Sequence, residues 1–412
     1  MGKHLIWITA FLALAFAGDR LVGYFLKEIT DNSQFRYSRL YNSNETADIL
    51  FVGNSRGLNF YQPEAERVTG QKTMNLSYNG MPADLAKSLV MDYLDRHIAP
   101  KIMVVDVTLC DRYNESLKAS MNLYTPYSKR LADLLKNSVS LNLISPKNSV
   151  AVDTTDIYAG RKVFYGGQLS HLYRYNSEIF QRVLYHRNRT DNDWIVDRVI
   201  GSSAASDTAL RSYQVRMFPV MVEHLKEMIA YAKEKGVNVK LVINPYFPAF
   251  AESIRDSFLT PLKMYVESQT GMPVSDFSTA LHNIDEIGDY QHANKKGSIR
   301  YMNVLSENGI FNILNNSALG NINGNSNRGT SSNPSSDIFI DFTSNALPTK
   351  AQKVSTVQQV DPISFSNENV SPHEPASLIP FSVLLSKKKQ AAKKRKPKYD
   401  FGFSVDTVGL GQ

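Results

Sequence analysis

Five short apolar runs alternate with stretches of helical periodicity, and this alternation constrains the fold of the chain more than any other feature. Continuous apolar runs of this length are typical of strands that are buried on both faces. Helical stretches between such strands predict an α/β fold with a doubly wound parallel sheet. The runs are ADILFVG at 47–53, TMNLS at 73–77, KIMVVDVTL at 101–109, VNVKLVIN at 237–244 and MPVSDF at 272–277.

The helical stretches carry signals at their ends. Pro82 and Asp84 mark the beginning of a helix after the second run. A helix before the fourth run is predicted to end at Gly236, where a glycine commonly follows the last helical residues. A further helix is expected around 251–268. Apolar side chains recur at helical spacing in the first two, at Leu85, Leu89 and Tyr93 and at Met221, Leu225, Met228 and Ala232.

The interval 112–205 interrupts this alternation, because it is polar, rich in tyrosine and without a clear period. Its aromatic side chains are of a kind that stacks on sugar rings, but such residues more often form the local core of a helical insertion. We therefore interpret the interval as an insertion whose aromatic residues pack internally. These residues are Tyr124, Tyr127, Tyr158, Tyr165, Tyr173, Tyr175 and Trp194.

The first 30 residues predict export or membrane attachment. Lys3 precedes an uncharged apolar run at 5–17, as in an export signal, and Ala15-Phe16-Ala17 suits signal peptidase. A second apolar stretch, LVGYFL at 21–26, prolongs the helix towards the roughly 20 residues that a membrane span needs. We favour an uncleaved signal anchor at 1–30, with a cleaved signal peptide as the alternative and a buried amphipathic helix as a weaker one. In either of the first two cases the bulk of the chain is expected outside the cytoplasm.

The C-terminal region has a different composition. Residues 316–412 begin with an Asn/Ser/Gly-rich segment and contain the basic run KKKQAAKKRKPK at 387–398. We expect a low-complexity, disordered tail without a packed core. Its basic run is most simply a solvated charged segment, and an anionic polymer or a lipid surface is the specific partner that it suits best.

The net charge of +7 comes from that basic run. The run holds eight of the 46 basic residues, and without it 38 basic residues face 39 acidic ones. A folded face that binds nucleic acid is therefore not expected. Cys110 is the one cysteine, which excludes a disulfide within the chain and a cysteine-rich zinc site. No cofactor and no metal are expected.

Two segments at predicted strand ends carry the residue types of a serine hydrolase. Gly53-Asn54-Ser55-Arg56 follows the first run, and Asp289-Tyr290-Gln291-His292 follows the last. Ligands of parallel α/β sheets bind outside the carboxyl ends of the strands. An Asp three residues before a His can accept the Nδ1 proton, which leaves Nε2 to take a proton from the serine.

These residues resemble the SGNH (GDSL-like) hydrolase superfamily over about residues 45–310. Ser55 in GNS matches its first block, with Asn54 where many members have Asp. NLSYNG at 75–80 resembles the second block, which makes the N–H groups of Ser55 and Gly80 the expected oxyanion donors. DYQH resembles the last block, which makes Asp289 and His292 the expected partners of Ser55. The third block, glycine-x-Asn-Asp, is missing, and Cys110-Asp111 stands in its place.

The resemblance implies a flavodoxin-like three-layer α/β/α sandwich and a serine acyl-transfer activity. The chain is similar to membrane-anchored envelope proteins related to alginate O-acetylation proteins and to the D-alanyl transfer protein of teichoic acids. Such proteins work with a multispanning membrane acyltransferase, so an acylated donor and a polysaccharide acceptor are the expected partners. The alternatives are an esterase or deacylase acting on an acylated glycan and a catalytically weak scaffold of an envelope assembly. Arg56 is expected to bind an anionic substrate group or, as an alternative, to form a scaffold salt bridge.

Overall fold

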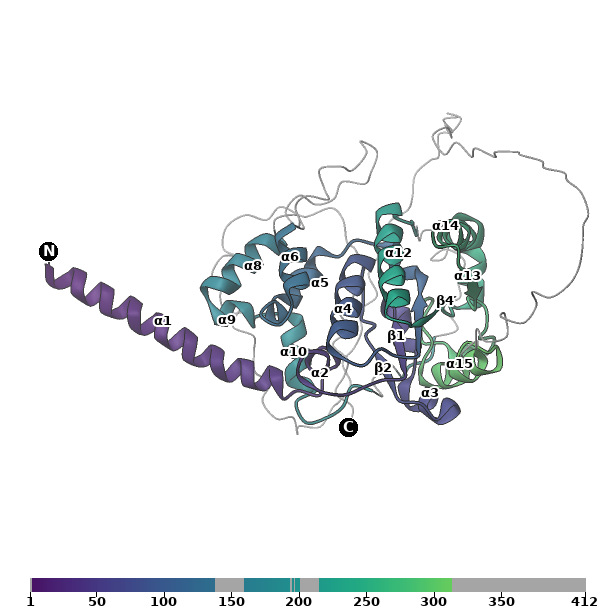
Figure 1. The fold of residues 1–412 in the computed structure, drawn as a ribbon, viewed down its shortest axis with the longest axis horizontal. Coiled ribbons are helices and arrows are strands. Elements are labelled where there is room, and N and C mark those ends of the chain that lie inside the picture. Colours follow the sequence, from purple (N-terminus) through teal and green to yellow (C-terminus); the bar gives the residue numbers. More distant parts are fainter. Residues whose placement is uncertain (1, 138–158, 193–194, 196, 201–214, 313–412) are drawn as a thin grey trace, which may run out of the picture. The chain divides into compact units, whose positions relative to one another are not determined.

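The computed structural model describes residues 2–137, 159–192, 195, 197–200 and 215–312 (Figure 1). The predictions for the tail at 316–412, its basic run, Tyr158 and Trp194 lie outside the described residues. Residues 2–312 contain all the elements that position the candidate site.

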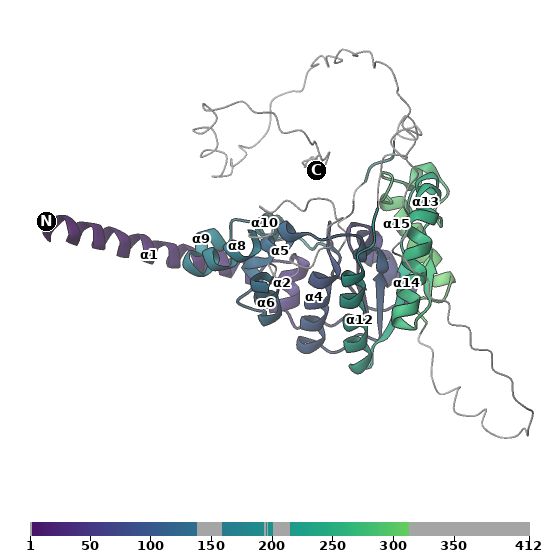
Figure 2. The same cartoon turned by 90° about the horizontal axis from the view of Figure 1, so that it is seen from above.

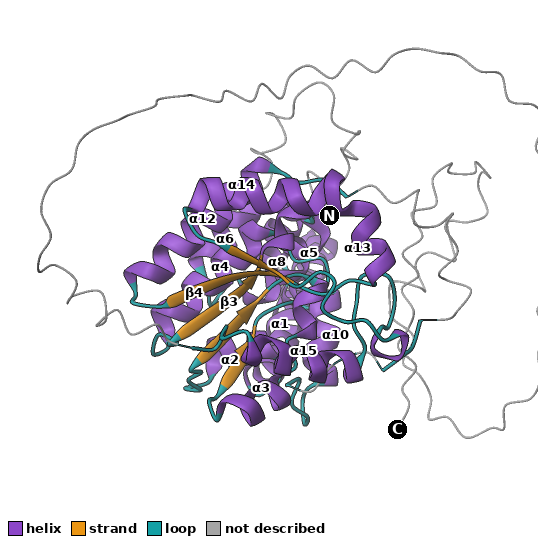
Figure 3. Ribbon diagram, turned by 90° about the vertical axis from the view of Figure 1, so that its right-hand side faces the viewer, coloured by secondary structure: helices purple, strands orange, loops and turns teal. Residues whose placement is uncertain are grey.

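Five parallel strands form one sheet in the order β2-β1-β3-β4-β5 (Figure 3). Each strand lies within one of the five apolar runs, so the prediction of an α/β fold with a parallel sheet is confirmed. The order reverses direction at β1, whose neighbours are β2 and β3. The strands are β1 Ile49–Val52, β2 Thr73–Asn75, β3 Ile102–Asp106, β4 Asn238–Ile243 and β5 Val274–Asp276.

Alternate residues of the strands belong to two separate hydrophobic clusters, as expected for a sheet covered on both faces. Leu50 and Val52 pack in the larger cluster, together with apolar residues of α4 (Ala83–Arg96) and α12 (Pro219–Glu234). Ile49 and Phe51 pack in the other, with residues of α3 (Gln62–Thr69) and α15 (Lys295–Glu307). This explains the continuous apolar sequence of β1 and of the first four residues of β3, because both side-chain directions are buried there.

The predicted helix ends agree with the structure. Pro82 is the N-cap of α4, and α12 is followed by Gly236, whose φ of 81° lies in the left-handed region that glycine adopts easily. The helix expected around 251–268 is divided into α13 (Pro248–Ile254), a π-helical turn η6 (Arg255–Leu259) and α14 (Thr260–Thr270).

The described part of the interval 112–205 is mainly helical. Tyr124 and Tyr175 are buried in the larger cluster, as expected for local core residues, whereas Tyr165 and Tyr173 are about half exposed. The elements here are α5 (Glu115–Ser120), the 3₁₀ turn η3 (Met121–Tyr124), α6 (Lys129–Asn137), α8 (Ala159–Leu169), α9 (His171–Arg174) and α10 (Glu178–Tyr185). The 3₁₀ turn η2 (Val107–Asp111) directly precedes the interval.

The chain begins with a single long helix, α1 (Gly2–Asp31), which is followed by α2 (Arg36–Asn42). Its most apolar window is not buried in the protein, and the helix is long and apolar enough to cross a membrane or to act as a signal sequence. The exposed apolar side chains exclude the alternative of a buried amphipathic helix. Figure 2 shows that α1 lies next to α9.

Candidate active site

Ser55 begins the 3₁₀ turn η1 (Ser55–Asn59), directly beyond the carboxyl end of β1. Asn54 holds this turn, since its Oδ1 accepts a hydrogen bond from the Arg56 N–H (3.1 Å) and its Nδ2 donates to the Thr108 carbonyl (3.0 Å). Asn54 is buried and Ser55 is half-buried. The turn therefore presents the serine at the sheet edge where ligands of parallel α/β proteins bind.

Gly53 and Gly57 allow the turn to approach its neighbours closely. A Cβ on Gly53 would lie 2.9 Å from the Gly57 Cα and 3.0 Å from the Asp106 Cβ. A Cβ on Gly57 would lie 2.3 Å from the Ser77 Oγ. Because these two glycines have no side chains, the backbone of the serine turn packs directly against the end of β3 and against the segment that follows β2.

Arg56 points into the protein and joins several strand ends. Its Nε donates to Thr108 Oγ1 (2.9 Å), its Nη2 to Asp111 Oδ2 (2.8 Å) and its Nη1 to Gln291 Oε1 (3.0 Å). The guanidinium also lies over the Tyr246 ring, 4.9 Å from the ring centre. Arg56 is 1% exposed and forms an ion pair with Asp111. Of the two expectations for Arg56, the structure therefore supports the scaffold salt bridge and not the contact with a substrate.

Asp289 and His292 form the pair that their spacing predicts. The His292 Nδ1 lies 2.7 Å from Asp289 Oδ1, and because a carboxylate only accepts, Nδ1 carries the proton. The same oxygen accepts the backbone N–H groups of Gln291 (2.9 Å) and His292 (3.0 Å), while Arg198 bonds Asp289 Oδ2. The His292 Nε2 is buried and has no hydrogen-bond partner among the described residues, so no described side chain engages the ring nitrogen that would accept a proton.

The loop that carries this pair is held by backbone hydrogen bonds. The His292 carbonyl accepts from the Gly288 N–H (2.9 Å) and the Asp289 N–H (3.2 Å), and the Tyr290 carbonyl accepts from the Phe247 N–H (3.0 Å) beyond β4. Behind the loop, a Cβ on Gly297 in α15 would lie 2.0 Å from the Glu286 carbonyl oxygen. Gly297 is therefore needed where the helix crosses the loop.

The bond between Arg56 and Gln291 brings the two predicted segments together. These residues are the immediate neighbours of Ser55 and His292, and they are separated by 235 positions in the sequence. Ser55 and His292 make no direct hydrogen bond in this structure. Catalytic hydrogen bonds often form only when substrate is bound, so the arrangement remains compatible with a Ser–His pair.

The segment that resembles the second block ends in a constrained turn. Gly80 has a φ of 66°, and its carbonyl accepts a hydrogen bond from Asn114 Nδ2 (2.9 Å). No hydrogen-bond partner is seen in the described part of the chain for the backbone N–H of Gly80 or for that of Ser55. These two groups are the oxyanion donors that the resemblance implies, and this assignment stays a prediction.

The position of the missing third block is occupied by η2. Cys110 is buried here, and Asp111 lies between the guanidinium groups of Arg56 and Arg112. The Arg112 Nη1 lies 3.9 Å from the position that a Cβ on Gly80 would occupy. Asn114 Nδ2 lies closer to that position, at 2.7 Å, so an asparagine side chain and a guanidinium group both stand next to the second-block glycine.

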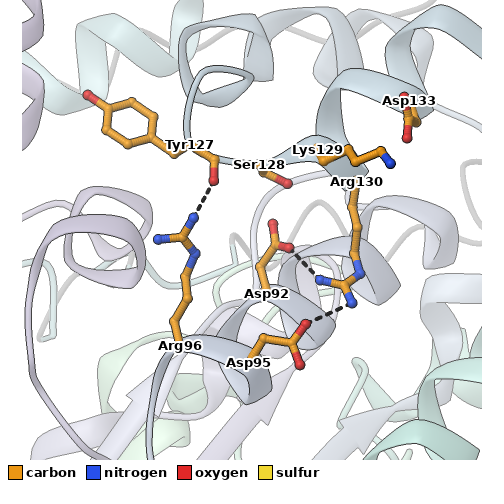
Figure 4. A pocket seen from close by; sticks show the side chains of 8 residues that line it. All are labelled: Asp92, Asp95, Arg96, Tyr127, Ser128, Lys129, Arg130 and Asp133. Atoms are coloured by element: carbon orange, nitrogen blue, oxygen red, sulfur yellow. Dashed lines mark hydrogen bonds and ion pairs between the residues drawn. The ribbon is translucent and has the colours of Figure 1, made fainter.

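A surface pocket of about 650 Å³ lies elsewhere, between the C-terminal end of α4 and the beginning of α6 (Figure 4). Arg130 bonds both Asp92 (3.0 Å) and Asp95 (2.8 Å), and Arg96 donates to the Tyr127 carbonyl. The charges in this pocket are largely paired with one another. Because α4 runs antiparallel to the strands, the pocket also lies away from their carboxyl ends.

Within the described ranges, no group of three or more His, Cys, Asp or Glu side chains is arranged to hold a metal ion. No protein-family model matches the chain, and no curated protein sequence matches it.

The environment of Asp289 predicts a defined loss of stability in acid. Partial burial alone raises the pKa of this carboxyl, but the bond and attraction to His292, together with the bonds from Gln291 and Arg198, bring its pKa well below the ordinary value. Ionised Asp289 therefore stabilises the fold fully above its unfolded-state pKa of about 3.9, and this contribution is lost as the pH falls from there towards the folded-state pKa.

We expect the free energy of unfolding of the parent protein to fall between about pH 4 and pH 2 more steeply than that of Asp289→Asn. Urea unfolding at a series of pH values would measure both slopes. Parallel slopes for the two proteins would contradict the assigned interactions of Asp289.

Proposed function

We propose that this protein is an extracytoplasmic, membrane-tethered serine acyl-transfer enzyme of the SGNH (GDSL-like) type. The five-stranded parallel sheet with separate hydrophobic clusters on its two sides supports a flavodoxin-like three-layer α/β/α fold. The observation that carries the proposal is the Arg56–Gln291 hydrogen bond, because it holds the serine turn beside the Asp289–His292 pair.

In the first step of the proposed reaction, Ser55 Oγ attacks an ester carbonyl while His292 Nε2 takes its proton. Asp289 holds the ring in the tautomer with Nδ1 protonated and stabilises the imidazolium that forms. The tetrahedral intermediate then expels the alcohol, which receives the proton from His292, and leaves an acyl-serine. In the second step a sugar hydroxyl or a water molecule attacks the acyl group while His292 takes its proton. The bond between the acyl carbon and Ser55 Oγ then breaks, and His292 returns the proton to Ser55.

Negative charge on the tetrahedral intermediate would be stabilised by the N–H groups of Ser55 and Gly80. Since the third-block asparagine is missing, a further donor must come from another residue. The candidates are the two donors next to Gly80: Asn114 Nδ2, which bonds the Gly80 carbonyl, and the Arg112 guanidinium, whose charge would favour an oxyanion.

The substrate assignment follows from the resemblance and from the N-terminal helix. A tethered acyl-transfer site suits the O-acetylation of a cell-surface or exported polysaccharide, with an acylated donor supplied by a multispanning membrane acyltransferase. When water replaces the sugar hydroxyl, the same site is an esterase or deacylase acting on an acylated glycan. A cleaved N-terminal helix would leave the same enzyme free outside the cytoplasm.

A second candidate function is a catalytically weak scaffold of an envelope assembly. Two observations favour it: the asparagine of the third block is absent, and Ser55 and His292 make no direct hydrogen bond. The two candidates differ in whether the purified protein cleaves a simple ester.

The full chain in detergent is expected to hydrolyse a short-chain aryl acetate, and His292→Ala should lower the rate by about 10²–10⁴-fold. His282→Ala is the matched control, because His282 is exposed and lies before the catalytic loop; it should retain the parent rate. Activity that is equal in the two variants would contradict the role of His292. A parent protein without activity towards aryl esters would support the scaffold.

A further inference from the structure

The adjacent charges Asp19 and Arg20, which interrupt the apolar part of α1, are engaged with the turn between α8 and α9. Asp19 Oδ1 accepts hydrogen bonds from Ser170 Oγ (2.6 Å) and the Leu172 N–H (3.0 Å), and its Oδ2 accepts the His171 N–H (2.8 Å). Asp19 therefore satisfies the free N–H groups at the beginning of α9.

Arg20 and Gly23 complete this contact. The Arg20 Nη2 donates to the Leu169 carbonyl (3.0 Å), one of the carbonyls left free at the end of α8. A Cβ on Gly23 would lie 2.2 Å from the His171 Nδ1. Because glycine has no Cβ, α1 and α9 can lie closer together here than they could with a larger residue at position 23. The α8–α9 turn, residues 165–173, is thus docked on α1 at the level of residues 19–23.

The length of the apolar segment determines where this docked turn lies in a membrane. Residues 5–18 alone would give a helix of about 21 Å, which is too short for a hydrocarbon core of about 30 Å. Extension to Leu26 gives about 33 Å, which is sufficient. A span that ends at Leu26 therefore places residues 19–23, and the turn that they hold, about 5–10 Å below the boundary between lipid and water, which is the depth at which interfacial segments lie.

The surface of the α8–α9 turn has the composition that this boundary requires. Leu169 is 76% exposed and Leu172 is 51% exposed, although both are large apolar residues. Tyr165 and Tyr173 beside them are 52% and 46% exposed, and tyrosine is enriched at membrane–water interfaces. Exposed apolar side chains that gather in one patch mark an interaction surface.

We infer that the α8–α9 turn is a second membrane contact, which lies in the interfacial layer of the bilayer beside α1. This inference rests on the proposed membrane anchor but not on the proposed acyl-transfer chemistry. The bilayer is the occupant because the patch is held at the membrane-spanning helix itself. Two attachment points, unlike a single helix, fix the orientation of the domain, so the strand-end site faces the membrane at a constant angle.

Site-specific fluorescence in vesicles of phosphatidylcholine and phosphatidylglycerol tests this inference, using the full chain. Cys110 is fully buried, so a cysteine introduced at the surface can be labelled selectively with an environment-sensitive fluorophore. The test position is Leu172→Cys, and Phe11→Cys reports on the anchor. Met264→Cys is the matched control, because Met264 is 60% exposed on α14, which packs against the edge strand β5.

Lipids carrying a nitroxide near the headgroup should quench the label at position 172 by on the order of half, as for an interfacial segment, and leave position 264 unchanged. Quenching at position 11 but not at position 172 would overturn the inference and leave the anchor intact. Absence of quenching at position 11 would overturn both. Because no other protein is present, quenching at position 172 also excludes a protein partner as the necessary occupant. The same quenching pattern in Ser55→Ala would separate this result from the proposed chemistry.

Discussion

Replacement of Arg56 with methionine is expected to lower the free energy of unfolding by about 3–5 kcal/mol. Arg56 is the cation between two buried carboxylates: its Nη2 bonds Asp111 at 2.8 Å, and its Nε lies 4.0 Å from Asp106. Burial raises the pKa of Asp106 even with Arg56 present, and its Oδ2 has no hydrogen-bond partner among the described residues. Without the guanidinium, this charge is not compensated.

Arg67→Met is the matched control for this prediction. Arg67 also bonds a carboxylate, that of Glu64, but its side chain is 64% exposed, and exposed ion pairs contribute about 0–1 kcal/mol. Urea unfolding of the full chain in detergent, followed by circular dichroism, would compare the two variants. A loss below about 1 kcal/mol for Arg56→Met would contradict the structural role that the contacts of Arg56 assign to it.

If the proposed function holds, Asp289→Asn is expected to lower kcat/KM for an ester substrate by about 10⁴-fold, as loss of the carboxylate does in a Ser–His–Asp protease. An amide at this position can donate to Nδ1, which favours the tautomer with the proton on Nε2. His292 would then present a donor to Ser55 and could not take its proton. The expected effect is on kcat rather than KM, because the imidazolium forms only during the reaction.

Asp285→Asn is the appropriate control, since Asp285 lies in the same region, is about half exposed and pairs with Lys296 at the surface. It should retain the parent kcat/KM for the aryl acetate. Equal effects of the two substitutions, or an effect of Asp289→Asn on KM alone, would count against the orienting role of Asp289.

The sheet could be predicted from sequence because a strand buried on both faces has a strong local signal. ILFV in β1 and IMVV in β3 are apolar on both side-chain directions, and β1 is followed by the small and polar residues Gly53, Asn54 and Ser55. The Asp289–His292 pair was also predictable, because a spacing of three residues within one turn needs no knowledge of the rest of the fold.

The contacts of Arg56, Arg198 and Asp19 could not be predicted in this way. Each joins segments far apart in the sequence: Arg56 reaches Gln291, Arg198 reaches Asp289, and Asp19 reaches the residues that begin α9. A charged residue beside a serine has the same sequence pattern whether it faces a substrate or a buried carboxylate. Only the structure shows that Arg56 faces inward and that the Asp19-Arg20 pair docks on α8 and α9.

The central claim is that Ser55 is a nucleophile activated by His292. Intact mass measurement after treatment of the full chain with a serine-reactive phosphonate tests it most directly. We expect one adduct per chain, located on the peptide containing Ser55, absent from Ser55→Ala and strongly slowed in His292→Ala. Labelling of Ser55→Ala to the same extent as the parent would contradict it.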